Sequence, residues 1–223
     1  MQAELEIYGG GGYDTTQQRG NPSEDIVSEF RKEFASFIDK LSPIRDSTTR
    51  FLMLTAFINT FMEERGLGRI TISRGFAAEF YSGGGYRTLD VDVIVEGKPN
   101  AADLLKKFLK SVGYTESGRV YVSTLSSLVD KALDIVGTIY DKPKPPMRIR
   151  VNDYRVYMVP PEEAIIYALA AAKFWSSVSD FERAVLIYAA QKESIDISYL
   201  EARAVEENVK DYLSKIMELS KNI

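Results

Sequence analysis

The sequence predicts an α/β fold of the α+β kind, in which helices flank a small mixed sheet. Apolar residues recur at helical spacing over residues 23–66, and again over residues 160–223. Between them, residues 67–159 carry short β-branched runs interrupted by glycine and proline, as is typical of strands and turns. We therefore expect an N-terminal helical pair, an α/β core and a C-terminal helical region, preceded by a flexible arm over residues 1–22.

The N-terminal helical pair is predicted from caps and apolar stripes. Ser23 is a suitable N-cap for a first helix that ends near Leu41, before a Ser-Pro pair. A second helix follows Asp46 or Ser47 and stops at Gly66, a suitable residue just after a helix end. We expect this pair to pack on the sheet or to mediate self-association into a homo-oligomer.

The remaining elements follow from changes in period along the chain. Short β-branched runs read as strands, Asn152-Asp153 reads as a hairpin turn, and longer amphipathic runs read as helices. In order, we expect strand 69–73, helix 75–81, a strand ending near 96, helix 101–112, strands 119–122 and 133–139, hairpin strands 147–151 and 154–159, and helices 162–174, 180–191, 197–207 and 209–219.

Composition excludes several classes of chemistry. The 223 residues include neither cysteine nor histidine, which excludes disulfides, thiol nucleophiles, zinc fingers and a histidine base. The net charge of −4 gives no global basic footprint for nucleic acid. No signal peptide or membrane-length apolar run is visible, so we expect a cytoplasmic protein with no membrane partner. Absent cysteine with abundant Tyr, Lys and Glu favours a thermophilic source.

Two carboxylates stand in an otherwise apolar strand, in the run Arg87 to Val95. Alternation along a strand places Asp90 and Asp92 on one face, roughly 6.5–7 Å apart. Carboxylates among apolar residues are costly to keep ionised unless a positive charge lies between them. A divalent cation is the simplest candidate, and Mg²⁺ or Mn²⁺ suits carboxylate ligands.

A third strand carboxylate and a glycine turn extend this pattern. Asp134 interrupts an apolar strand, and it would join Asp90 and Asp92 if the two strands are neighbours. Gly75 opens a helix beside the same sheet edge, and a helix N-terminus with closely approaching backbone is a natural phosphate site. Carboxylate-bound Mg²⁺ with phosphate on a helix N-terminus is typical of phosphoryl and nucleotidyl transfer.

From Gly75 through the short helix to Arg87-Thr88-x-Asp90-x-Asp92, the sequence resembles the DNA polymerase β-type nucleotidyltransferase superfamily. It is most similar to the minimal prokaryotic members, which include AbiEii-like toxins, and the resemblance extends over residues 70–200. The resemblance implies a nucleotidyltransferase-like fold in which Asp90 and Asp92 bind metal and a third strand carboxylate completes the triad. Asp134 matches that third position by its strand context.

The resemblance also implies a nucleotide-binding set. The family carries a Lys-x₆-Asp spacing after the sheet, which this chain reproduces. The chain departs from the family where Phe76 follows the turn glycine, a place that Ser or Gly usually occupies, so phosphate contact there falls to the backbone N–H, Ser73 or Ser82. The residues expected to bind nucleotide are Gly75, Phe76, Arg87, Thr88, Lys173 and Asp180.

Each of these residues also has a purely structural interpretation. Asp90 and Asp92 would then be solvated on an exposed edge strand, and Asp134 would pair with an Arg or Lys. Arg87 either contacts phosphate or forms an ion pair with Asp92. Lys173 either faces a ligand or lies along its helix with its head in solvent.

Aromatic and basic residues offer weaker signals. Tyr167, Trp175 and Tyr188 are predicted as core residues rather than platforms for base stacking. A local basic cluster is a solvated face by default, with nucleic-acid or phosphate contact as the sharper alternative. Its members are Lys142, Lys144, Arg148, Arg150 and Arg155.

The function predicted from this resemblance is Mg²⁺- or Mn²⁺-dependent transfer of a nucleoside monophosphate from a nucleoside triphosphate (NTP) to a hydroxyl. The acceptor would be a protein, an RNA or a small molecule, with Asp134 as third metal ligand or general base. The alternative is a catalytically inactive module of the same fold that binds a protein or nucleic-acid partner, which the Gly75-Phe76 pair motivates. A third option is a toxin neutralised by an antitoxin.

Overall fold

The structure, a computed structural model, describes residues 22–220, so the arm predicted over residues 1–22 lies outside the described residues except for its last position. The predicted α/β class is confirmed. The helices are α1 Pro22–Leu41, α2 Ser47–Glu64, α3 Arg74–Tyr81, α4 Ala101–Ser111, α5 Pro161–Phe174, α6 Val178–Gln191, α7 Ile197–Glu206 and α8 Lys210–Leu219. The strands are β1 Gly68–Ser73, β2 Asp90–Gly97, β3 Tyr114–Ser117, β4 Val120–Ser123, β5 Ala132–Gly137, β6 Met147–Val151 and β7 Tyr154–Met158.

One mixed sheet organises the core, in the order β3-β4-β5-β2-β1-β7-β6. The central strand β1 is antiparallel to β2 and parallel to β7, and β2 is parallel to β5. Strand β3 was not predicted, because its four residues Tyr114–Ser117 are polar or exposed after the first. The sequence therefore indicated the strands with buried faces and missed a short, exposed edge strand.

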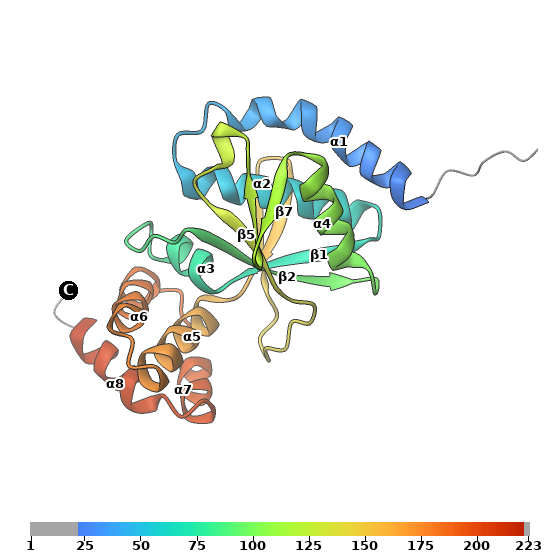
Figure 1. Cartoon of the computed structure of the whole chain (residues 1–223). Coiled ribbons are helices and arrows are strands. Elements are labelled where there is room, and N and C mark those ends of the chain that lie inside the picture. Colours follow the sequence, from blue (N-terminus) through green and yellow to red (C-terminus); the bar gives the residue numbers. More distant parts are fainter. Residues whose placement is uncertain (1–21, 221–223) are drawn as a thin grey trace, which may run out of the picture.

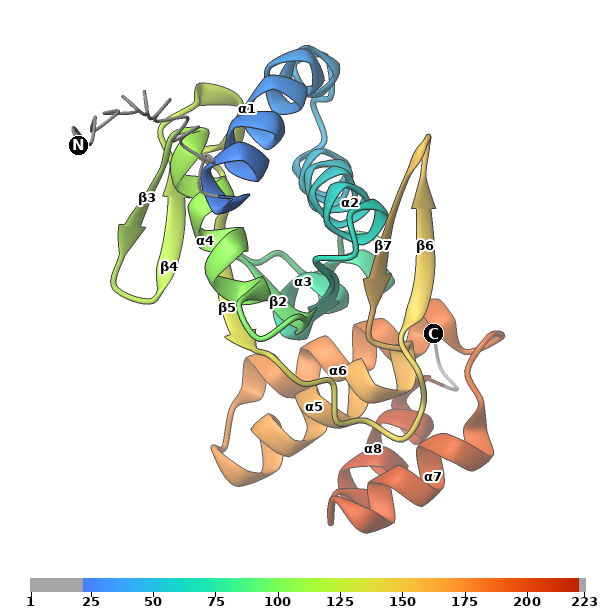
Figure 2. The same ribbon diagram turned by 90° about the vertical axis from the view of Figure 1, so that its right-hand side faces the viewer.

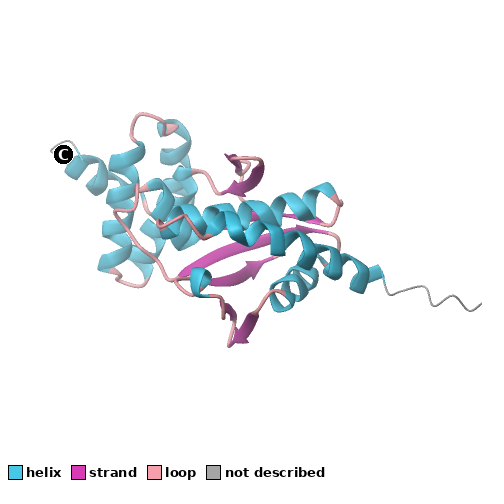
Figure 3. Ribbon diagram, turned by 90° about the horizontal axis from the view of Figure 1, so that it is seen from above, coloured by secondary structure: helices cyan, strands magenta, loops and turns pink. Residues whose placement is uncertain are grey.

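Helices cover the sheet on two sides (Figures 1 and 2). Helices α1, α2 and α4 pack on one face, while α5 to α8 gather in a separate layer beyond α3. The view from above shows the strands running between these helical layers (Figure 3). None of the helices within residues 22–220 is long and apolar enough to span a bilayer.

Phenylalanine rings join the first helical layer. Phe30 of α1 stacks on Phe108 of α4 at 4.6 Å between ring centroids, and Phe37 stacks on Phe57 of α2 at 4.0 Å. These rings are almost fully buried. The helical pair therefore packs within the main core, in agreement with the first of its two predicted arrangements.

Helix α2 differs from the amphipathic helix that its apolar stripe predicts, because every residue from 51 to 62 is buried. Its polar residues are satisfied by backbone groups of the sheet. Asn59 Oδ1 accepts from the N–H of Ile70 at 2.7 Å, and its Nδ2 donates to the carbonyl of Arg155 at 2.8 Å. The N–H of Arg155 donates to Thr60 Oγ1 at 2.8 Å. These bonds explain how Asn59 and Thr60 lie in the core with their hydrogen-bonding groups paired.

The N-cap of α2 gives a first prediction. Asp46 accepts from both the N–H and the Oγ1 of Thr49 at 2.7 Å. We expect Asp46→Ala to lower the free energy of unfolding by about 1 kcal/mol, because the N–H of Thr49 in the first turn of α2 then loses its acceptor. Urea unfolding measures this, with the exposed Asp39→Ala as control, expected to change stability by less than about 0.5 kcal/mol. Equal losses in both variants would contradict the capping role.

Ion pairs and a tyrosine link α5, α7 and the β5–β6 connection. Lys144 Nζ donates to Glu162 of α5 at 2.8 Å, and Arg203 Nε of α7 donates to Glu163 at 2.8 Å. The hydroxyl of Tyr199 also donates to Glu163, at 2.5 Å, and accepts from the N–H of Lys144. The connection therefore lies fixed against α5 and α7.

Candidate active site

The strand register brings two of the predicted carboxylates together. Asp92 of β2 lies opposite Ser73 of β1 on one side and opposite Asp134 of β5 on the other. Residues paired across neighbouring strands point to the same face of a sheet, so these three form one row. The predicted adjacency of the two carboxylate strands is thus observed, and Asp90 lies two residues along β2 on the same face.

Asp92 is the most perturbed carboxylate of this row. Its side chain is almost buried, and the residue is 8% exposed. Burial raises the pKa of Asp92 from 3.8 to about 6, and repulsion from Asp134 and Asp90 adds to the rise. The positive charge of Arg74 and the backbone N–H of Gly75 act in the opposite direction. A buried carboxyl group with a pKa of about 6, close to two other carboxyl groups, is an environment that favours a bound cation.

Asp134 has the partner that its structural interpretation predicted. Arg119 Nε lies 2.9 Å from Asp134 Oδ2, although the arginine side chain is 75% exposed and the carboxylate 3%. The contact lacks hydrogen-bond geometry, so Oδ2 remains a buried acceptor without a donor. An exposed arginine is readily released to solvent, so this pair blocks Asp134 only weakly.

The side-chain oxygens of the row are of the kind that binds a hard divalent cation. Asp92 and Asp134 are adjacent, and the Oγ of Ser73 is also buried without a partner. Oxygen donors of this kind are those that Mg²⁺ and Mn²⁺ prefer. Within residues 22–220, however, no three acidic side chains converge closely enough to hold a metal ion. The complete triad with Asp90 stays a prediction.

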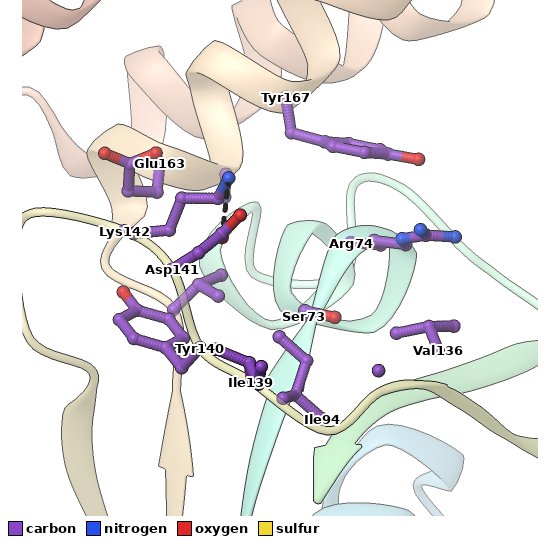
Figure 4. A pocket seen from close by; sticks show the side chains of 13 residues that line it. Ser73, Arg74, Ile94, Val136, Ile139, Tyr140, Asp141, Lys142, Glu163 and Tyr167 are labelled. Carbon is purple, nitrogen blue, oxygen red and sulfur yellow. Dashed lines mark ion pairs between the residues drawn. The ribbon is translucent and has the colours of Figure 1, made fainter. Parts of the chain in front are cut away.

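A cavity of about 260 Å³ adjoins the row. It lies between the ends of β1, β2 and β5, the β5–β6 connection and helix α5 (Figure 4). Ser73 and Arg74 line it where β1 meets α3, and Tyr167 lines it from α5. Figure 4 shows the pair Asp141–Lys142 on the opposite wall, 3.0 Å apart. The cavity therefore meets the row at Ser73, while Ile94 and Val136, rather than Asp92 and Asp134, line it from β2 and β5.

The turn from β1 into α3 requires glycine at position 75. A Cβ there would lie 2.9 Å from Thr88 Oγ1, so Thr88 and the turn are in close contact. The left-handed residue is the preceding one, Arg74, with φ of 51°. Phe76 is fully buried in the core. Its side chain therefore cannot contact a ligand, and the departure from the family pattern at Phe76 affects core packing rather than the cavity.

A buried network holds the segment that leads into β2. Glu79 of α3 accepts from the N–H of Thr88 at 2.8 Å and from Lys131 Nζ at 2.7 Å, and both charged residues are almost fully buried. Arg87 Nη1 donates to the same carboxylate at 3.2 Å and to Thr48 Oγ1 at 2.8 Å. Arg87 thus pairs with Glu79 and not with Asp92, and its contact with phosphate stays a prediction.

Lys173 and Asp180 do not line the cavity. Lys173 Nζ donates to the carbonyl of Asn208 at 2.6 Å and to Asp211 of α8 at 2.8 Å. Asp180 forms an ion pair with Arg183 at 2.8 Å. Lys173 therefore joins α5 to α8, whereas Asp180 pairs within α6, so the two side chains have different partners.

The predictions for the aromatic and basic residues agree with the structure only in part. Tyr188 is buried as predicted, whereas Trp175 is 74% exposed and Tyr167 lines the cavity. The basic cluster is not one surface. Lys142 faces the cavity and Lys144 is paired with Glu162, while its arginines lie on the β6–β7 hairpin.

Sequence reasoning missed three residues of the site. Arg74 precedes the turn glycine, and its left-handed φ has no signature in an arginine. Glu79 is the one charged residue among the mainly apolar residues 75–81 of α3, which was a usable signal for a buried charge. Its partner Lys131 lies 52 residues away, and no local pattern connects the two.

The comparisons with known proteins bear on the fold. The sequence matches no protein-family model and no curated protein. The structure is similar to the crystal structure of an antigenic nucleotidyltransferase-like protein from Paracoccidioides brasiliensis. The TM-score is 0.51 at 14% identity, over 78% of this chain and 93% of that one. It overlaps less well with the solution structure of the antibiotic-resistance factor ANT(2'')-Ia, at a TM-score of 0.44 and 14% identity, over 77% and 95% of the two chains. The fold that carries the Asp92–Asp134 row and its cavity is nucleotidyltransferase-like.

Proposed function

We propose that this chain transfers a nucleoside monophosphate from an NTP to a hydroxyl acceptor. The observation that carries the proposal is the row of Ser73, Asp92 and Asp134 beside a cavity, on a nucleotidyltransferase-like sheet. Asp90 and Asp92 would hold Mg²⁺ or Mn²⁺, with Asp134 as third ligand. The metal, when bound, supplies charge neutralisation at the phosphates and orients them.

The chain's own residues have distinct tasks in this reaction. The acceptor hydroxyl attacks the α-phosphorus, the bond to the bridging oxygen breaks, and pyrophosphate leaves. Asp134 is the candidate to take the hydroxyl proton, because its Oδ2 is buried without a donor. The Gly75 N–H, at the N-terminus of α3, stabilises negative charge near Asp92. The Glu79 network fixes Thr88 and with it the start of β2.

The alternative is an inactive module of the same fold that binds a protein or nucleic acid. Two observations favour it: Arg119 pairs with Asp134, and no three acidic side chains converge on a metal position in the described part of the chain. Membership of the AbiEii-like subgroup, with an antitoxin as partner, remains part of the proposal. A protein, an RNA or a small molecule remains open as acceptor.

Calorimetric titration tests the proposal directly. We expect Mg²⁺ and NTP together to bind the wild-type chain, and Asp90→Asn with Asp92→Asn to weaken binding by at least about 10-fold, because the metal loses its charged ligands. The matched control is Asp103→Asn, an exposed acid paired with Lys106 at 3.0 Å on α4. Transfer of labelled nucleotide to cell extract, lost in the double variant, separates enzyme from module. Binding that survives the double variant would refute the metal site.

A further inference from the structure

Arg119 brings a positive charge to the third carboxylate of the row from the edge of the sheet. It belongs to the turn between β3 and β4, the edge hairpin that lies next to β5 (Figure 2). Its Nε lies 2.9 Å from Asp134 Oδ2, and no other ion pair or side-chain hydrogen bond joins it to a residue between 22 and 220. The side chain of Arg119 is therefore devoted to a proposed metal ligand.

The hairpin turn leaves Arg119 free to move. Ser117 pairs with Val120, so Gly118 and Arg119 form a two-residue loop. Gly118 has a φ of 62° and Arg119 has no positive φ, which is the pattern of a type II′ turn with glycine at its first central position. A Cβ on Gly118 would point into open space, since no described residue beyond its neighbours lies within 4 Å. The guanidinium can therefore leave Asp134 without disturbing packed structure.

The two members of the pair differ in how much they depend on each other. The carboxylate of Asp134 is 3% exposed, and its Oδ2 is buried and receives no hydrogen bond, whereas the arginine side chain is 75% exposed. A buried carboxylate is costly to keep ionised without a positive charge nearby, while an exposed arginine gains little from its partner. Asp134 therefore needs a cation, and a different cation can replace Arg119.

Arg119 and a metal ion exclude each other at this oxygen. A Mg²⁺ ion bound to Asp134 Oδ2 at its usual distance of about 2.0–2.1 Å would lie within about 5 Å of the Arg119 Nε, given the 2.9 Å of the observed pair. Two positive charges at that separation repel each other, and the exposed one moves away at little cost. The guanidinium and the metal are therefore alternative counter-ions of Asp134.

We propose that Arg119 is a displaceable internal cation that competes with Mg²⁺ for Asp134 and thereby sets the metal concentration at which the site is filled. The inference rests on the proposed function, because it takes the row as a metal site, and deepens it by assigning the regulation of that site to the edge hairpin. In the metal-free protein the guanidinium neutralises Asp134, and it moves into solvent when the metal binds. The Arg119–Asp134 pair is then a resting state of the site.

Arg119→Gln is the informative variant, because it removes the charge and keeps a long polar side chain at an exposed turn. Arg119→Lys keeps the charge without the guanidinium. The matched control is Arg148→Gln on β6, the strand at the opposite edge of the sheet. Arg148 is exposed and has no ion pair within the described part of the chain, so this control makes the same change in net charge without touching the row.

The first measurement is calorimetric titration of the full chain with Mg²⁺ alone. We expect Arg119→Gln to bind Mg²⁺ about 5-fold more tightly than the wild type, because no internal cation then has to be displaced. Arg119→Lys should stay closer to the wild type, and Arg148→Gln should bind as the wild type does. A merely structural role of Arg119 predicts the opposite sign, since a disturbed hairpin would weaken the metal site.

The second measurement is urea unfolding in a chelator and at saturating Mg²⁺, which needs no catalytic activity. In chelator, Arg119→Gln should be less stable than the wild type by about 1 kcal/mol, the free-energy equivalent of the 5-fold change, because Asp134 has lost its counter-ion. At saturating Mg²⁺ this deficit should disappear, since the metal then neutralises Asp134 in both proteins. A deficit that is equal in chelator and in Mg²⁺ would show that Arg119 is a permanent counter-ion and would overturn the inference.

The outcomes separate this inference from the proposed function. Mg²⁺ binding that is lost in the Asp90/Asp92 double variant and is equally tight in the wild type and Arg119→Gln would overturn the competition while leaving the metal site intact. No Mg²⁺ binding to the wild type or to Arg119→Gln would refute the metal site and the inference together, and would favour the inactive module. Tighter binding to Arg119→Gln, with a deficit confined to chelator, would support both.

Discussion

Glu79→Gln is expected to lower the free energy of unfolding by about 3–5 kcal/mol, because it leaves Lys131 charged, buried and without its counter-ion. Burial alone would raise the pKa of Glu79, but the bonds from Lys131, Thr48 and the Thr88 N–H lower it below 4.5. Stability from this carboxylate is therefore present above its ordinary pKa and is lost as the pH falls through the lowered value.

Urea unfolding at neutral pH measures the effect of Glu79→Gln. The control is Glu116→Gln, which breaks the exposed pair with Lys110 at 2.7 Å and should leave the free energy of unfolding nearly unchanged. Combining Glu79→Gln with Lys131→Met should recover part of the loss, since the second change removes the unpaired buried charge. A loss as small as that of Glu116→Gln would show that the network does not hold the segment before β2.

Asp92→Asn should stabilise the metal-free protein by about 3 kcal/mol at pH 7, although it removes a proposed metal ligand. The pKa of Asp92 is raised from 3.8 to about 6, chiefly by burial, so the folded state holds this proton more tightly than the unfolded state. Wild-type stability therefore decreases as the pH rises from 3.8 through 6, and the neutral amide escapes this decrease.

The measurement is urea unfolding of both proteins in a chelator between pH 3.5 and 8. The difference should be absent below pH 3.8, grow up to pH 6 and stay constant above it. Added Mg²⁺ should stabilise the wild type more than the variant, since the variant lacks one of the three proposed carboxylate ligands. Equal stabilities at all pH values, or a wild type that is more stable at pH 7 in chelator, would contradict the raised pKa.

The elements that could be predicted from the sequence are those whose periodicity is local. The stripe of Phe30, Phe34 and Phe37 indicated α1, and the run of β-branched apolar residues around Asp90 and Asp92 indicated β2. Both match the structure because burial controls the pattern, on one face of α1 and on both faces of β2. The short polar strand β3 has no such face, and a period rule cannot detect it.

The candidate site could be predicted only in part, for a related reason. Asp92 and Asp134 were identified because acids in apolar strands are conspicuous in a sequence. The pairing of Glu79 with Lys131 and the identity of Arg119 as the partner of Asp134 could not be predicted, since these contacts join distant segments. The direction of Phe76 and the left-handed φ of Arg74 depend on how α3 leaves β1, which residue type alone does not determine.

The parallel pairing of β1 with β7 has a consequence for the order of assembly during synthesis. The carboxylate row needs only β1, β2 and β5, which are complete once residue 137 has been translated. The other neighbour of β1, over residues 154–158, and the cavity wall on α5 emerge later. Chains fold from the N-terminal end as they emerge, and distant pairings form slowly. The strands that carry the acidic row are therefore synthesised before the segments that complete the cavity that would enclose a nucleotide.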